Sequence, residues 1–134
     1  MMDKLTQKSQ EALKAAQELA RERSHQELDG AHLALALTRQ TDTIVPTLLQ
    51  RVGVDLASWE SDLNAELDRR AQVEGVSSSD VFLSRDLKQA LDRAEQEAKA
   101  LADEYLSAEH LLLGLLECGA ALKKLFQRHD VERS

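Results

Sequence analysis

The chain repeats its own sequence at a distance of 78 residues, and this repeat limits the folds that it can adopt. Between Leu5 and Leu37, ten of 33 positions are identical to the residue 78 positions later, and no gap is needed. The matches place His32 on His110. Shared helical composition accounts for some alanine and leucine matches, but not for two histidines that arrive in phase. The sequence therefore predicts two copies of one helical unit.

Apolar residues recur at spacings of three and four, which is typical of amphipathic helices, and capping residues precede each stripe. The expected N-caps are Thr6, Asp29 and Asp55 in the first copy and Ser84 and Ser107 in the second. Pro46 suits the first turn of a further helix, which should end near Gly53. Residues 32–37 are nearly all apolar, so their helix should lie in the centre. We predict an all-α, pseudo-twofold duplicated bundle of seven to eight short helices.

The repeat also predicts the domain organisation, a single domain over residues 1–134. Copy one should span about 3–70, a linker rich in glycine and serine about 71–82, and copy two about 83–134. With the shift reduced by one, residues 48–51 match 125–128, so the third helix is repeated as well. The counterpart of the fourth helix would need residues after Ser134. We therefore expect a truncated final helix and a fragment of a larger protein.

Composition excludes several classes of function. Lysine and arginine number 17 against 24 aspartate and glutamate residues, a formal charge of −7, which disfavours a nucleic-acid surface. No apolar run approaches the roughly 20 residues that span a bilayer, and the start of the chain lacks a secretory signal. A single cysteine, Cys118, fits a reducing compartment and should be a buried or half-buried thiol without a role. These features predict a cytoplasmic protein without membrane or nucleic-acid partners.

The sharpest local motif is a capping residue followed three positions later by a histidine. It occurs as Asp29-Gly-Ala-His32 and as Ser107-Ala-Glu-His110. A side chain at that position can reach back to the amides of the helix start or pack against the other copy. A two-histidine metal or acid–base site is the alternative, but the further ligands or nucleophile that it needs are missing. The other histidines, His25 and His129, lie in segments that we expect at the surface, and no enzyme fingerprint is present.

Several segments together resemble a known family, the Clp N-terminal domain or Clp repeat. They are Gln10–Leu13, Ala16–Ala20, His32–Leu37 and Gly53–Asp55 in copy one, and Tyr105–Leu113 in copy two. Gln72-Val73-Glu74-Gly75 is most similar to the ClpB disaggregase branch of that family. The resemblance implies a module tethered to a hexameric AAA+ motor, which is absent from this chain. ATP would bind to the motor domains, so this domain should need no cofactor and catalyse nothing.

The resemblance implies recruitment of unfolded or aggregated client proteins, through their exposed apolar segments, for the AAA+ domains of the same chain. A groove between the two copies would suit weak binding that tolerates many sequences, because apolar walls gain about 25 cal/mol per Å² when covered. Two alternatives stay open. The chain could be the adaptor-docking N-domain of a protease-linked Clp unfoldase of the ClpA or ClpC type, or a stand-alone Clp regulator.

The resemblance also implies client-handling roles for Thr6, Asp103 and Glu109. Thr6 could instead only cap its helix, worth about 1 kcal/mol, and Glu109 could only favour a helix N-terminus electrostatically. In ClpC-type domains the glutamate before each repeat histidine recognises phosphorylated arginine. Copy two keeps Glu109 but copy one has Ala31, so we do not expect paired phosphoarginine recognition. We expect the functional positions to lie where the copies differ or where they meet.

Overall fold

The computed structural model describes residues 5–70, 81–116, 118–129 and 131, and within these ranges the fold is helical, with one pair of two-residue strands. The elements are α1 (Gln7–Glu22), β1 (Glu27–Leu28), α2 (Gly30–Arg39), α3 (Ile44–Arg51), α4 (Leu56–Asp68), β2 (Phe82–Leu83), α5 (Arg85–Ala100), α6 (Ala108–Leu115) and α7 (Gly119–Arg128). The predicted all-α duplicated bundle is confirmed. The expected linker falls mainly on residues 71–80, outside the described ranges, and the truncated final helix stays a prediction.

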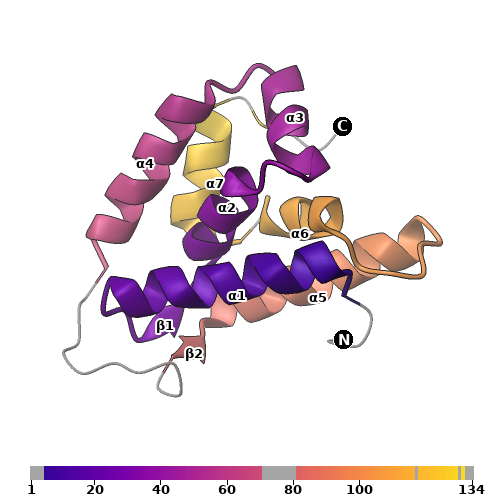
Figure 1. Cartoon of the computed structure of the whole chain (residues 1–134), viewed down its shortest axis with the longest axis horizontal. Helices are drawn as coiled ribbons and strands as arrows, with labels where there is room; N and C mark the ends of the chain where they lie inside the picture. Colours follow the sequence, from indigo (N-terminus) through magenta and orange to yellow (C-terminus); the bar gives the residue numbers. More distant parts are fainter. Residues whose placement is uncertain (1–4, 71–80, 117, 130, 132–134) are drawn as a thin grey trace.

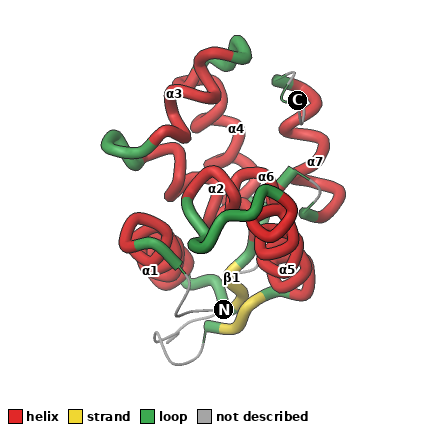
Figure 2. The backbone as a smooth tube through the Cα atoms, turned by 90° about the vertical axis from the view of Figure 1, so that its right-hand side faces the viewer, coloured by secondary structure: helices red, strands yellow, loops and turns green. Residues whose placement is uncertain are grey.

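The helices lie in three tiers that reflect the duplication (Figures 1 and 2). The long helices α1 and α5 lie along one side of the molecule, and α2 and α6 pack on them. On the far side of α2 and α6 lie α3, α4 and α7. The equivalent pairs α1 with α2 and α5 with α6 therefore occupy matching places in the two copies.

Each copy begins by pairing its main chain with the other copy. The amide of Thr6 donates to the carbonyl oxygen of Leu106 (3.1 Å), and the amide of Ser84 donates to that of Leu28 (2.9 Å). Both donors and both acceptors are 78 positions apart, so the two contacts are equivalent. They belong to parallel pairings, in which β1 pairs with β2 and Leu5 bridges Leu106. These pairings join the start of α1 to the start of α6, and the start of α5 to the start of α2.

Helix α2 forms the centre of the core, as its apolar sequence predicts. Every residue from Gly30 to Thr38 is buried, because neighbouring helices cover all its faces. Alanines at positions 12, 16 and 20 give α1 a fully buried small face toward α2. Burying leucines at this density contributes roughly 1.5–3 kcal/mol for each side chain. Packing of leucine and alanine therefore holds the bundle together, with few aromatic rings.

Trp59 on α4 joins copy one to copy two. Its indole N–H donates to Thr38 Oγ1 (2.9 Å). Its ring packs against Phe126 in α7 and against His129, the C-cap of α7, with ring centroids 5.0 and 5.3 Å away. His129 Nε2 also lies 2.7 Å from Asp62 Oδ2. The expectation that His129 belongs to the surface is therefore wrong, because α4 covers most of the ring. The local sequence could not show that α4 packs there.

Candidate functional site

The two repeat histidines cap the N-termini of α2 and α6. The amide of Asp29 donates to Nδ1 of His32, and the amide of Ser107 donates to Nδ1 of His110, both at 3.0 Å. Since Nδ1 accepts a hydrogen bond, each neutral ring carries its proton on Nε2. Both rings are buried. The motif found in the sequence is thus used in the same way by both copies.

The turn before each of these helices supplies a partner for the free ring nitrogen. Ser24 and Ala102 lie two residues after the ends of α1 and α5, and both have φ of 58°, the left-handed conformation that closes many helices. The next amides, those of His25 and Asp103, bond back to the carbonyl five residues earlier, both at 2.8 Å. Equivalent turns therefore bring His25 and Asp103 to equivalent places beneath the capping histidines.

The two copies differ in the group that accepts the hydrogen bond from Nε2 of the capping histidine. In copy one His32 Nε2 donates to Nδ1 of His25 (2.9 Å), and in copy two His110 Nε2 donates to Oδ2 of Asp103 (2.8 Å). His25 is only 3% exposed, so the expectation of a surface position is wrong for it as well. The shift of 78 residues already aligned His25 with Asp103, seven residues before each histidine. That alignment was the available signal, but the two residue types look unrelated.

Ser107, His110 and Asp103 together have the composition of a nucleophilic triad, but their geometry is that of a helix cap. The Ser107 hydroxyl oxygen lies 3.0 Å from His110 Nδ1, the nitrogen that already accepts the Ser107 amide. A general base needs an available lone pair to take the hydroxyl proton. Because that lone pair holds a main-chain amide, this arrangement stabilises α6 and does not activate a nucleophile.

Thr6 lies beside this cluster with both its amide and its hydroxyl engaged. Its amide binds Leu106, and its Oγ1 accepts the amide of Ser9 at 3.2 Å, which makes it the N-cap of α1. The same hydroxyl donates to Ser9 Oγ (3.0 Å), which donates to the carbonyl oxygen of Leu106 (3.0 Å). Thr6 and Asp103 therefore both hold the segment between α5 and α6, Thr6 through Leu106 and Asp103 through His110.

Glu109 is the third candidate, and its carboxylate is available. It lies in the first turn of α6, is partly exposed, and makes no hydrogen bond or ion pair within the part of the chain that the structure describes. Leu112 and Leu113 follow it by three and four residues, so all three share one face of the helix. Glu109 therefore borders an apolar surface and can approach a bound segment.

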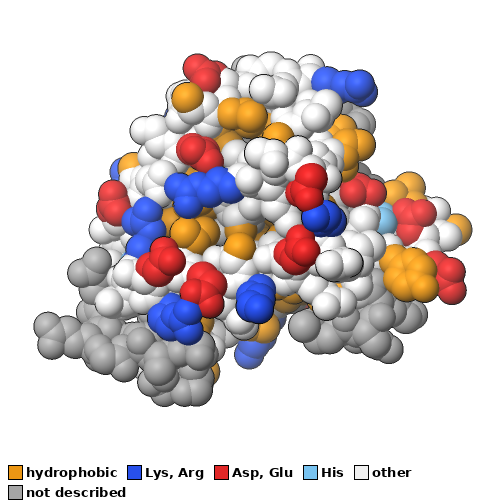
Figure 3. Space-filling model, viewed as in Figure 1, with side chains coloured by type: hydrophobic (Ala, Val, Ile, Leu, Met, Phe, Trp, Pro, Cys, Tyr) orange, Lys and Arg blue, Asp and Glu red, His pale blue; other side chains and the backbone are white. Residues whose placement is uncertain are grey.

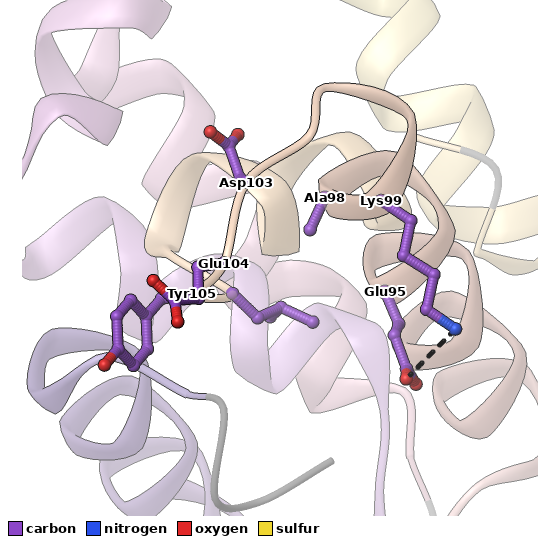
Figure 4. Close-up of a pocket in the computed structure, with 7 residues that line it drawn as sticks. Glu95, Ala98, Lys99, Asp103, Glu104 and Tyr105 are labelled. Carbon is purple, nitrogen blue, oxygen red and sulfur yellow. Dashed lines mark ion pairs between the residues drawn. The ribbon is translucent and has the colours of Figure 1, made fainter.

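Large apolar side chains are exposed at the turn between α5 and α6. Leu101 and Tyr105 are 58% and 57% exposed, with Asp103 and Glu104 between them in sequence. Figure 3 shows acidic and hydrophobic side chains next to one another at this right-hand end of the molecule. A shallow pocket adjoins the turn, lined by Glu95, Ala98, Lys99, Asp103, Glu104, Tyr105 and Leu106. In Figure 4, Tyr105 and Glu104 lie on one side and the Glu95–Lys99 ion pair on the other.

A second apolar hollow lies between α3 and α6, that is, between the two copies. Its lining residues are Leu48, Leu49, Val52, Leu112, Leu113, Leu116 and Val131. In copy one the equivalent surface is covered by α4, because the groups around Trp59, namely Thr38, Phe126 and His129, are the counterparts of Leu116, Leu49 and Val52. The hollow thus corresponds to a surface that a helix of this chain covers at the equivalent place. No such internal contact corresponds to the exposed turn between α5 and α6.

The described residues contain neither a candidate membrane span nor a candidate metal site. No described helix combines the length and the apolar character that crossing a bilayer requires. Within residues 5–70, 81–116, 118–129 and 131, no three histidine, cysteine, aspartate or glutamate side chains gather in a way that could hold a metal ion. Cys118 is buried as the sequence predicts, and burial raises the pKa of its thiol to about 12.

The helical fold with its paired capping histidines belongs to a class of domain that is found in known proteins. The family model of the Clp repeat (R) N-terminal domain matches residues 4–129. The chain therefore belongs to the Clp N-terminal domain family, whose members are not catalytic domains.

The curated relatives place it near one group within that family. The chaperone protein ClpB of Nitratidesulfovibrio vulgaris is 42% identical over 116 residues, which cover 85% of this chain and 13% of the relative. ClpB 1 of Parasynechococcus marenigrum is 39% identical over 123 residues, 90% of this chain and 14% of the relative. The chain thus spans about a seventh of the length of these chaperones.

Solved structures share the fold at lower identity. The Hsp104 N-terminal domain of Candida albicans superposes with a TM-score of 0.84 at 22% identity, covering 96% of this chain and 83% of that one. The N-domain of ClpV from Vibrio cholerae gives 0.79 at 21% identity, covering 93% and 76%. These likenesses concern the architecture alone.

Proposed function

We propose that this domain recruits misfolded or aggregated client proteins for a ClpB-type disaggregase, by binding their exposed apolar segments and passing them to an AAA+ motor. The ClpB relatives support this branch over the adaptor-docking and stand-alone alternatives. The proposal includes a hexameric motor on the same polypeptide and a cytoplasmic location, which the lone reduced cysteine suits.

The observation that carries the proposal is the exposed apolar turn between α5 and α6. Leu101 and Tyr105 adjoin the segment that Thr6 and Asp103 hold, and the unpaired Glu109 begins the next helix. Exposed aromatic side chains on a rigid support are typical of protein-binding surfaces. The neighbouring carboxylates keep this apolar patch hydrated and disfavour acidic segments. The surface therefore suits an apolar segment that lacks acidic residues.

The size of this patch implies weak binding. A tyrosine has roughly 200 Å² of surface, so the exposed fraction of Tyr105 offers about 115 Å², worth at most about 3 kcal/mol when covered. Leu101 adds a similar amount, and ordering the client subtracts several kcal/mol. Net affinities weaker than about 1 µM follow, which suits a module that must release its client to the motor.

The test compares two exposed aromatic residues at opposite ends of α5. Tyr105→Ser removes the ring at the proposed site, and Phe82→Ser removes an equally exposed ring (59%) on β2. The 134-residue chain is titrated with a permanently unfolded protein and with its folded form. We expect Tyr105→Ser to weaken binding of the unfolded protein about 5–30-fold, corresponding to about 1–2 kcal/mol, and Phe82→Ser to leave it unchanged.

Two outcomes would contradict the proposal. Equal binding of the folded and unfolded forms would remove client recruitment as the function. Equal weakening by Tyr105→Ser and Phe82→Ser would remove the α5–α6 turn as the site. Circular dichroism of each variant checks that the fold is intact, and Glu109→Gln tests whether the free carboxylate selects among segments of different charge.

A further inference from the structure

In copy one the buried rings of His25 and His32 are in contact. At the equivalent place in copy two, His110 contacts the carboxylate of Asp103. His25 and His32 are 3% and 1% exposed, and their rings meet edge to face with centroids 5.1 Å apart. Their hydrogen bond runs from His32 Nε2 to His25 Nδ1. We propose that this pair is an acid-sensitive joint, which copy two lacks because Asp103 takes the place of His25.

The hydrogen bonds leave no vacant nitrogen for an incoming proton at the contact. His32 Nδ1 accepts the Asp29 amide, and His25 Nδ1 accepts the proton of His32. A proton added at either Nδ1 therefore breaks the cap of α2 or sets two N–H groups against each other. In copy two the group that accepts the hydrogen bond of His110 Nε2 is the Asp103 carboxylate, 2.8 Å away, so no second imidazole ring is present there.

The charged side chains around the pair are already engaged with one another. They are Arg23 with Asp68 (Nη1 to Oδ1, 2.7 Å) and Arg70 with Asp29 (Nη2 to Oδ2, 2.9 Å). Burial lowers the pKa of His25, and the positive charges of Arg23 and Arg70 lower it further by a smaller amount. Burial is the main cause that lowers the pKa of His32 to about 4, and the neighbouring His25 is the second. Asp68 and Asp29 favour the charged forms of His25 and His32, but burial is the larger effect on each pKa, and both carboxylates already pair with a guanidinium.

The cap that acid would break connects three elements. Asp29 begins α2, its Oδ2 binds Arg70 after the end of α4, and its Oδ1 accepts the hydroxyl of Ser84, the N-cap of α5 (2.8 Å). Cys118 faces Asp29 from the start of α7 and stays a neutral thiol, with its pKa raised by burial. Loss of the α2 cap therefore loosens the contact of copy one with the start of copy two.

The direction of the pH effect follows from linkage. Unfolded histidines bind protons below about pH 6.5, whereas the folded pair resists protonation, so stability is full above that pH and falls as the pH drops toward about 4. Between pH 7.5 and 5.5 the unfolding equilibrium constant should rise about tenfold from His32 alone. If both rings stay neutral in the fold, the rise reaches about 100-fold. The lowered pKa values of Asp42 and Asp62 act at lower pH, outside this window.

The experiment is urea unfolding of the 134-residue chain at pH 7.5, 6.5 and 5.5. His25→Asn keeps an acceptor for His32 but cannot titrate, so it should remove the part of the wild-type rise that comes from His25 and leave a rise of no more than about tenfold. Ser84→Ala is the matched control, because it weakens the same joint without touching the rings. It should raise the unfolding constant by the same factor at every pH.

NMR of the histidine ring nitrogens in the unsubstituted chain gives a second reading that does not depend on any variant. We expect the rings of His25 and His32 to keep unprotonated Nδ1 signals down to pH 5.5 while the chain is folded. Ordinary titration near pH 6.5 in the folded state, or the same pH dependence in His25→Asn as in the wild type, would overturn the proposal.

Discussion

Asp103→Ala tests whether this carboxylate contacts clients or supports the site through His110. Asp103 Oδ2 accepts the proton of the buried His110 Nε2 at 2.8 Å, while 48% of the Asp103 side chain is exposed. Hydrogen bonds to charged groups contribute about 1.5–3 kcal/mol, and the half-exposed carboxylate lowers the expected loss to about 1–2 kcal/mol. Asp103→Asn keeps an acceptor and should cost less than about 1 kcal/mol.

The assay is urea unfolding followed by circular dichroism at pH 7.5, paired with titration of an unfolded client at a temperature where every variant is folded. If Asp103 acts through His110, Asp103→Ala should lower stability and client binding together, and Asp103→Asn should restore both. The reasoning is refuted if Asp103→Ala unfolds within about 0.5 kcal/mol of the wild type but loses client binding, because the carboxylate would then contact clients itself.

Three further predictions concern the core. Gly30→Ala should lose about 1–3 kcal/mol in urea unfolding, because its new Cβ would lie 2.5 Å from Cys118 Sγ, and adding Cys118→Ala should recover part of the loss. Trp59→Phe and Thr38→Val each remove the indole hydrogen bond and should each cost about 1–2 kcal/mol, but a double-mutant cycle should show that the costs are not additive. Cys118 should react with a thiol reagent at pH 8 only as fast as the chain opens, since its pKa is about 12 and it is buried; rapid labelling of the folded chain would contradict this.

Much of the architecture could be predicted because the repeat and the apolar periodicity are local properties of the sequence. The caps Thr6, Ser84 and Asp55 bind the first amides of their helices, as their residue types predict. The parallel pairings of Leu28 with Leu83 and of Leu5 with Leu106 could not be predicted in this way. Pairings of two residues have no periodicity, and they form only when distant copies meet.

The positions of the histidines show where the local pattern fails. His25 and His129 have polar neighbours, so the sequence favoured a surface position, but α2 and α4 cover them in the fold. Their burial is decided by which helix packs over a helix end, and that is a property of the tertiary structure. The same limit applies to Tyr105, whose exposure follows from the turn that ends α5.

The difference between Glu109 and Ala31 is a difference in burial as well as in residue type. Ala31 is 1% exposed, because α2 lies in the centre of the bundle, whereas Glu109 lies partly exposed at the start of α6. A glutamate at position 31 would bury an unpaired carboxylate, which is strongly unfavourable. The position before the capping histidine is therefore closed in copy one and accessible in copy two, however similar the sequences. The duplication builds a core from equivalent caps, and unequal burial makes the surfaces of the two copies different.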